Sequence, residues 1–271
     1  MKRAIKAEYQ QQDGEFALAF KDLQTGKTIY INEHAIFHAA STMKTPVLIE
    51  AYKQAAAGNF SLSDSISIIN NFKSIADTSH FSLSPNDDSE LDLYKHIGEK
   101  ATIYSILYKM IILSSNFSTN IMIDKLGAAN VTATIRSFGA NDIQVLRGVE
   151  DNKAFQLGMN NVVSAYDLSL LFDKMANGQI VSQQACEGMI KILLDQKFND
   201  IIPAKLPKEV KVAHKTGWVT GIHHDSGIIF LPDGRKYVLV ELSKNLKDEK
   251  AAVAAMANVS EMIYEYMKSK N

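Results

Sequence analysis

Strand-like patterns at both ends of the chain enclose a long helical middle, and this order restricts the fold more than any other feature. In residues 15–23, Phe16, Leu18 and Phe20 alternate with smaller residues, and residues 27–32 follow as the return strand of a hairpin. Three more β-rich segments lie near the end, at residues 210–214, 227–231 and 237–242. The order predicts an α+β fold, in which an antiparallel five-stranded sheet from both ends is flanked by helices and carries an inserted all-helical lobe.

The middle of the chain repeats apolar residues at helical spacing. Thr102 is predicted to cap a helix in which Ile106 and Met110 share one face. Further helices are predicted at residues 117–126, 130–138, 164–177, 182–195 and 247–268. We therefore assign residues 1–60 and 208–271 to the sheet-containing lobe and residues 61–207 to the helical lobe. Residues 146–163 have weak periodicity, and loops of that length inside a domain often carry function.

Composition excludes several classes of protein. A net charge of −1 gives no basic excess for phosphates, so a nucleic-acid partner is not expected. The single cysteine, Cys186, is predicted to pack in a helix, and no metal or cofactor is predicted. No apolar run approaches the roughly 18 residues of a membrane span. The basic start Met1–Arg3 lacks a following apolar stretch, which fits either a cytoplasmic protein or a chain that begins after a removed leader.

The first motif with chemical meaning is Ser41-Thr42-Met43-Lys44, at the predicted start of a helix that reaches about Ala57. The i, i+3 spacing predicts that the Ser41 hydroxyl and the Lys44 amine lie within hydrogen-bonding reach. A serine needs a neighbouring base to become a nucleophile, and a desolvated lysine can serve. Pro46 predicts a distorted first turn. In isolation the motif would more often be an N-cap serine followed by a solvated lysine.

Two further motifs follow in a fixed order. Ser114-Ser115-Asn116 lies about 70 residues after Ser41, and Lys215-Thr216-Gly217 about 100 residues after that. Alone, the first is a common connector and the second an ordinary strand end. Together, the three motifs resemble those of class A β-lactamases and penicillin-binding proteins. The stretches FHAASTMKTPV, ILSSNFSTNIMIDKLG and VAHKTGWVTGIHHDSGIIFLPDG are similar to that family too.

The resemblance implies a role for each motif residue. Ser41 corresponds to the acylated nucleophile, Lys44 to its partner amine and Ser114 to a serine that relays a proton to the leaving nitrogen. The remaining matches bind substrate. Asn116 would hold the acyl-amide carbonyl, and Lys215 and Thr216 would bind the carboxylate. Gly217 would leave room for the substrate backbone, and the backbone N–H of Trp218 would complete the oxyanion hole with that of Ser41. The substrate would be a β-lactam or a similar acyl-D-amino acid. A monomer in the periplasm or outside the cell is expected.

Some residues depart from the family pattern. Ser115 occupies a position where an aspartate is common in the family. Because that aspartate is structural there, Ser115 should affect stability more than mechanism. Ser226 replaces an arginine that often supports the carboxylate site. His223 and His224 lie nearby and could partly substitute for it, although we expect solvated hairpin histidines. Metal binding by this pair is not expected, because adjacent strand residues point to opposite faces.

The departure that bears most on function is in the loop VLRGVEDNKAFQLGMNN. Family members carry a glutamate there that activates the deacylating water, and Glu150 lies one place later than the usual spacing from Arg147. Glu150 is our candidate base, and the alternative is an ion pair of Glu150 or Asp151 with Arg147 that holds the loop. Three functions remain open: a β-lactamase, a penicillin-binding sensor that deacylates poorly, and an esterase or D-peptidase.

Overall fold

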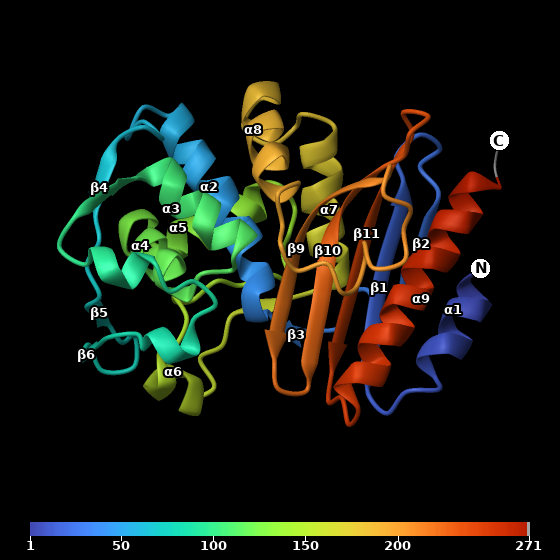
Figure 1. Cartoon of the computed structure of the whole chain (residues 1–271), viewed down its shortest axis with the longest axis horizontal. Helices are drawn as coiled ribbons and strands as arrows, with labels where there is room; N and C mark the ends of the chain where they lie inside the picture. Colours follow the sequence, from blue (N-terminus) through green and yellow to red (C-terminus); the bar gives the residue numbers. More distant parts are fainter. Residues whose placement is uncertain (270–271) are drawn as a thin grey trace.

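A five-stranded antiparallel sheet forms the centre of one lobe in the computed structural model, which describes residues 1–269 (Figure 1). The strand order is β2-β1-β11-β10-β9, and every neighbouring pair is antiparallel. The strands are β1 (Glu15–Asp22), β2 (Thr28–Ile31), β9 (Lys211–Val219), β10 (Ile222–Phe230) and β11 (Lys236–Lys244). The predicted α+β class and five-stranded sheet from both chain ends are therefore confirmed. β9 extends beyond the predicted segment and includes the whole Lys215-Thr216-Gly217 motif.

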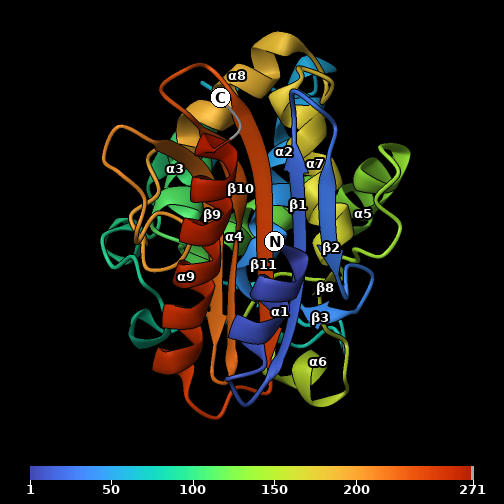
Figure 2. The same ribbon diagram turned by 90° about the vertical axis from the view of Figure 1, so that its right-hand side faces the viewer.

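The alternation in β1 separates two hydrophobic cores. Phe16, Leu18 and Phe20 point into the core beneath α1 (Lys2–Tyr9) and α9 (Glu249–Lys268). Ala17 and Ala19 face the opposite core, which is shared with the helices of the other lobe. Figure 2 shows α1 and α9 together on one face of the sheet. The sequence had not suggested α1, whose helical repeat amounts to a single buried pair, Ile5 and Tyr9.

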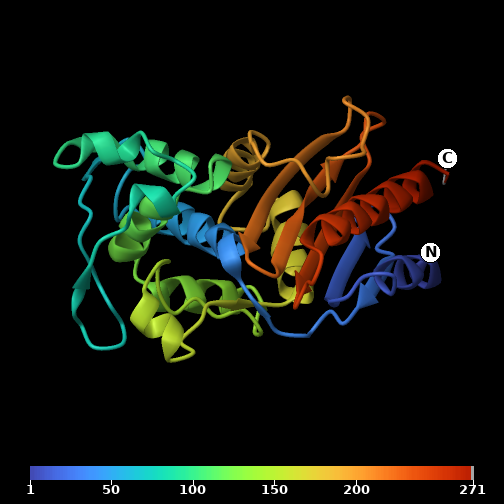
Figure 3. The same ribbon diagram turned by 60° about the horizontal axis from the view of Figure 1, so that its bottom comes forward.

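The second lobe is built mainly of helices, at the left in Figure 3. It contains α2 (Lys44–Ala56), α3 (Ile103–Ile112), α4 (Asn116–Leu126) and α5 (Ala128–Ser137), with short strands β4 (Ser65–Ser67), β5 (Phe72–Lys73), β6 (His80–Phe81) and β7 (Lys100–Thr102). The predicted cap on α3 is confirmed, because the Thr102 hydroxyl accepts a hydrogen bond from Ser105 N at 3.1 Å. Buried apolar residues of α2, α3 and α4 form one continuous core.

Two helices that the sequence assigned to the inserted lobe lie against the sheet. α7 (Ala165–Ala176) contacts β1, β10 and β11, and α8 (Gln183–Leu193) contacts β9. Cys186 is buried in α8 as a packing residue. The division of the chain at residues 60 and 208 stays a prediction.

The long loop at residues 146–163 contains short elements that its weak periodicity did not predict. α6 (Asn152–Gln156) lies within it, and β8 (Val162–Val163) at its end pairs with β3 (Phe37–His38). This pairing joins the loop to the segment that leads into Ser41. Of the helices in residues 1–269, none is both long and apolar enough to span a bilayer.

Candidate active site

Ser41 lies in a tight turn at the junction between the two lobes. The turn is a 3₁₀ helix, Ala40–Met43, and the α-helix begins only at Lys44, so the predicted distortion of the first turn is confirmed. Ala40 has a left-handed φ of 44°, a conformation that costs a non-glycine residue about 1–3 kcal/mol. His38 Nδ1 accepts a hydrogen bond from Ala40 N at 3.1 Å and helps to hold this strained residue. The hydrogen bond to His38 therefore helps to fix the backbone conformation just before Ser41.

Lys44 is completely buried, and its amine is directed at the second motif. Its Nζ lies 2.5 Å from Ser114 O, 3.2 Å from Ser114 Oγ and 3.0 Å from Asn116 Oδ1. None of the hydrogen bonds in residues 1–269 joins Lys44 to the Ser41 hydroxyl. The contact predicted from the i, i+3 spacing is therefore absent. The Lys44 amine donates to acceptors in the second motif instead. Burial lowers the pKa of Lys44 to about 7, against the opposing charges of Asp88 and Glu150. A large fraction of Lys44 is thus neutral near pH 7.

The Ser114 hydroxyl lies between two buried amines. Lys215 Nζ donates to Ser114 Oγ at 3.0 Å, and Lys44 Nζ lies 3.2 Å from the same oxygen. Burial, together with the charge of Lys44, lowers the pKa of Lys215 well below that of an ordinary lysine. Ser114 has a left-handed φ of 55°, which adds a second strained position at the site. One hydroxyl therefore connects the lysines of the first and third motifs.

A cavity of about 970 Å³ opens where the edge strand β9 meets the helical lobe. Its walls include one or more residues from each motif and from the long loop, namely Ser41, Ser114, Asn116, Glu150, Thr216, Gly217 and Trp218. Gly217 allows β9 to pack closely on the nucleophile turn, since a Cβ there would make a tight contact of 3.1 Å with Ser41 N. Of the predicted site residues, only the buried Lys44 and Lys215 do not line the cavity, and both contact Ser114, which does.

The second motif starts α4 and is held by a carboxylate that the sequence did not reveal. Ser115 is buried and caps the helix by accepting from Ser118 N at 3.1 Å, which fits a structural role. The Asp88 carboxylate accepts from Asn116 N at 3.0 Å and Phe117 N at 2.8 Å. It also accepts from Tyr94 OH at 3.0 Å. A carboxylate thus reaches this helix start from a distant loop, without a sequence pattern that links it to the motif.

Glu150 reaches the site from the long loop in an unusual conformation. Its φ is 58°, and its Oε1 accepts from Asn116 Nδ2 at 3.2 Å. Burial, with the negative charge of Asp87, raises the pKa of its carboxyl group above the ordinary value. Asn120, which the sequence analysis did not single out, holds the preceding residue: it donates to Val149 O at 2.9 Å and accepts from Val149 N at 2.7 Å. Glu150 is therefore next to the point at which the loop is anchored.

The alternative ion pair with Arg147 is not present in the described part of the chain. The Arg147 guanidinium donates to Met159 O, Gly148 O and Asn160 Oδ1 instead. The Asp151 carboxylate caps α6 through Ala154 N and accepts from Ser74 Oγ at 2.8 Å and from Ile75 N at 3.0 Å. Both residues hold the loop through hydrogen bonds to other groups, which leaves Glu150 directed at Asn116.

The two histidines differ from each other and from expectation. His224 was expected to be solvated but is completely buried; its Nε2 lies 2.9 Å from His38 O, and burial lowers its pKa to about 4. His223 is half-buried, lines the cavity and lies 2.8 Å from Glu249 Oε2. Ser226 is buried and donates to Lys215 O at 3.2 Å, so it contributes no charge to the cavity. Within residues 1–269, no group of three or more His, Cys, Asp or Glu is placed to hold a metal ion.

Comparison with known proteins identifies the family and the fold. β-Lactamase VEB-1 of Pseudomonas aeruginosa is 23% identical over 256 residues, which cover 90% of this chain and 82% of that protein. A β-lactamase structure from Sphaerobacter thermophilus is 25% identical with a TM-score of 0.85, over 100% of this chain and 98% of that one. The structure of PBP-A is 24% identical with a TM-score of 0.85, over 99% and 96%. A model of the β-lactamase enzyme family matches residues 1–267, and with that match the chain belongs to this family.

Proposed function

We propose that this protein is a serine hydrolase that opens β-lactam rings through a covalent acyl-enzyme on Ser41. The observation that carries the proposal is the chain of contacts from Lys44 through the Ser114 hydroxyl to Lys215, beside a nucleophile turn that lines the same cavity. A serine hydroxyl becomes a nucleophile only beside a base, and a lysine with a pKa of about 7 provides one near neutral pH.

In the proposed acylation, Ser41 Oγ attacks the carbonyl carbon of the ring and its proton passes to the neutral Lys44 amine. The backbone N–H groups of Ser41 and Trp218 would stabilise the negative oxygen of the intermediate. The carbon–nitrogen bond then breaks, and the nitrogen takes its proton from Ser114 Oγ. Ser114 regains a proton from Lys44, which lies 3.2 Å away. The cycle leaves an ester on Ser41 and a neutral Lys44.

The proposed hydrolysis requires a second base. Glu150 takes a proton from a water molecule that attacks the ester carbonyl, and Ser41 leaves with that proton. Glu150 lines the cavity and is hydrogen-bonded to Asn116, the residue that would hold the acyl-amide carbonyl. Lys215 and Thr216 would bind the substrate carboxylate. No protein cofactor takes part in these steps.

A second candidate is a penicillin-binding module that is acylated but deacylates slowly. The observation that favours it is the position of the loop anchor: Asn120 holds the backbone of Val149, and Glu150 follows with a left-handed φ of 58°. A glutamate displaced by one residue would activate water less well. An esterase or D-peptidase on the same scaffold is the third candidate, since the first step would be the same.

The deciding experiment is a chromogenic cephalosporin assay combined with mass spectrometry of the intact protein. Repeated turnover with a transient adduct supports the hydrolase. A stoichiometric burst followed by a lasting adduct supports the penicillin-binding module. Absence of both, with turnover of an acyl-D-amino-acid ester, supports the third candidate. We further propose a monomer that acts in the periplasm or outside the cell, which rests on the family resemblance alone.

A further inference from the structure

The cavity has two chemically different walls. On the helical-lobe side it is lined by polar and acidic residues, among them Asn116, Asp87 and Glu150. On the other side, next to the polar or charged Asp200, His223, Glu249 and Lys250, four apolar residues line it, namely Phe198, Ile201, Trp218 and Val253. We call these four residues the apolar shelf. They come from three separate segments, namely the loop after α8, the end of β9 and the first turns of α9, so the shelf depends on how the three are held together.

The exposed Trp218 side chain is fixed in place although it faces solvent. It is 62% exposed, and its Nε1 donates to Glu249 Oε2 at 3.0 Å. The other Glu249 oxygen accepts from Gly221 N at 2.8 Å, in the turn between β9 and β10. One carboxylate at the start of α9 therefore holds both the indole ring and the adjoining turn.

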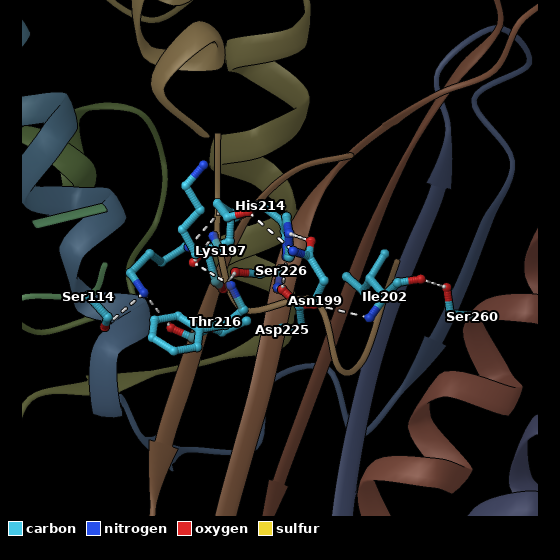
Figure 4. A network of polar contacts seen from close by, with 12 residues as sticks. Ser114, Lys197, Asn199, Ile202, His214, Thr216, Asp225, Ser226 and Ser260 are labelled. Carbon is cyan, nitrogen blue, oxygen red and sulfur yellow. Dashed lines mark hydrogen bonds and ion pairs between the residues drawn. The ribbon is translucent and has the colours of Figure 1, made fainter. Parts of the chain in front are cut away.

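The loop that carries Phe198 and Ile201 is anchored by a buried polar network beneath β9 (Figure 4). His214 Nδ1 lies 2.8 Å from Asp225 Oδ1, and both side chains are almost completely buried. Asn199 Oδ1 lies 3.3 Å from His214 Nε2, and Ile202 N donates to Asp225 Oδ2 at 3.1 Å. The anchoring residues Asn199 and Ile202 thus directly follow Phe198 and Ile201, which line the cavity.

Two further contacts complete the anchoring of this loop. Gln196 Oε1 accepts from Phe198 N at 3.2 Å and from Lys197 N at 2.9 Å. Ser260 Oγ, on α9, donates to Ile202 O at 2.8 Å. The loop is thereby tied to the sheet and to the helix that carries Val253. An apolar surface held in this way loses little conformational entropy when a ligand covers it.

We propose that the apolar shelf is a subsite for a large apolar or aromatic substituent on the leaving-group side of the substrate. The inference rests on the proposed function. Thr216 of β9, expected to bind the carboxylate of the leaving fragment, directly precedes Gly217 and Trp218, whereas Asn116, expected to bind the acyl amide, lies on the opposite wall. A substituent next to the carboxylate therefore meets the shelf, and one on the acyl group meets the polar wall.

Trp218 is the only tryptophan in the sequence, so its fluorescence reports on the shelf directly. The experiment uses the Ser41→Ala protein, which binds without acylation, and two cephalosporins with the same acyl group. One carries a 3-methyl group and the other an aromatic group at the same position. The aromatic compound should change Trp218 emission at a concentration about tenfold lower than the methyl compound. A third compound, with the aromatic group on the acyl side only, should behave like the methyl compound.

Variants of the shelf test the same idea in the active protein. Phe198→Ala should raise the KM for the aromatic compound about fivefold, leave the methyl compound within twofold, and be partly rescued by Phe198→Leu. Ile97→Ala, which removes an exposed apolar side chain outside the cavity, is the matched control and should change neither value. Equal effects of Phe198→Ala on both compounds, or a Trp218 response that follows the acyl group instead, would overturn the subsite.

Failure of the proposed function has a different signature. If the protein is not acylated at all, the parent gives no adduct by mass spectrometry, and if another residue is acylated, Ser41→Ala still gives one, whatever Trp218 reports in the binding titration. If Ser41 is acylated and Trp218 does not distinguish the compounds, the function stands and the shelf is not a subsite.

Discussion

The two sides of the active site are held in different ways. Lys44 and Lys215 are completely buried on an α-helix and on a β-strand, and both contact Ser114. Glu150 is exposed, lies on a loop and makes a single side-chain hydrogen bond within residues 1–269, to Asn116. The groups proposed for acylation are thus embedded in regular elements, and the group proposed for deacylation is not.

This difference suggests that the two steps respond differently to change. Side chains packed in regular elements have few alternative positions, so their chemistry is fixed when the chain folds. A carboxylate on a loop depends on the few hydrogen bonds that anchor the loop, here those of Asn120 to Val149 and of Asp151 to Ser74 and Ile75. A substitution that disturbs the loop should therefore slow hydrolysis of the acyl-enzyme without slowing its formation.

The largest expected effect is that of Ser41→Ala. Removal of the hydroxyl leaves no atom to form the ester, so covalent labelling by a penicillin should be abolished in intact-protein mass spectrometry. Cys186→Ala is the matched control, because the only thiol of the chain is buried in α8 away from the cavity. Labelling that persists in Ser41→Ala would assign the nucleophile to another residue.

Glu150→Gln should separate the two steps. Loss of a general base typically lowers a rate by about 10²–10⁴-fold, so hydrolysis should slow by that factor and the acyl-enzyme should accumulate. The rate of adduct formation should change little, because Lys44 and Ser114 are untouched. Rapid-quench mass spectrometry measures both rates.

Asp151→Asn serves as the control for Glu150→Gln. It neutralises the adjacent carboxylate, which binds Ser74 and Ile75 rather than Asn116, and should slow hydrolysis less. If both variants turn over substrate like the parent, the Glu150 carboxylate is structural, and the assignment of acylation and deacylation to the two sides of the site is wrong.

The pH dependence of acylation tests the buried side alone. Burial lowers the pKa of Lys44 to about 7, so the amine is neutral above that pH and protonated below it. Acylation should therefore be nearly constant above pH 8 and fall about tenfold per pH unit well below 7. Single-turnover measurements of adduct formation isolate this step from hydrolysis. A flat profile between pH 5 and 8 would show that Lys44 is not the base.

The same division separates what the sequence predicts from what it does not. Period-two and helical patterns predict the sheet and the helix α3, because burial of one face dictates these patterns. Three ordered motifs predict the residues at the cavity, but not the hydrogen-bond partner of Lys44, which depends on acceptors about 70 residues away. His224 was expected to be solvated because its strand looked like a hairpin end, whereas β3 covers it. Asp88 and Asn120 escape prediction because their partners are backbone groups of distant segments.

The smallest expected effect tests whether a loop residue can control the buried side. Asp88 accepts the backbone N–H groups of Asn116 and Phe117, so Asp88→Ala leaves the start of α4 without its carboxylate. Loss of a helix cap costs about 0.5–2 kcal/mol, which corresponds to a fall in melting temperature of about 1–4 °C for a chain of this size. Asn116 and Ser114 should then be less well held, and acylation should slow by about two- to fivefold.

Asp88→Asn keeps one oxygen acceptor and should recover part of both losses. Asp87→Asn, which neutralises the exposed neighbouring carboxylate, should leave the melting temperature within 1 °C of the parent, about the effect of an ordinary surface substitution. If Asp88→Ala slows hydrolysis but not acylation, the loop acts on Glu150 instead, and the boundary between the two sides of the site has to be redrawn through Asn116.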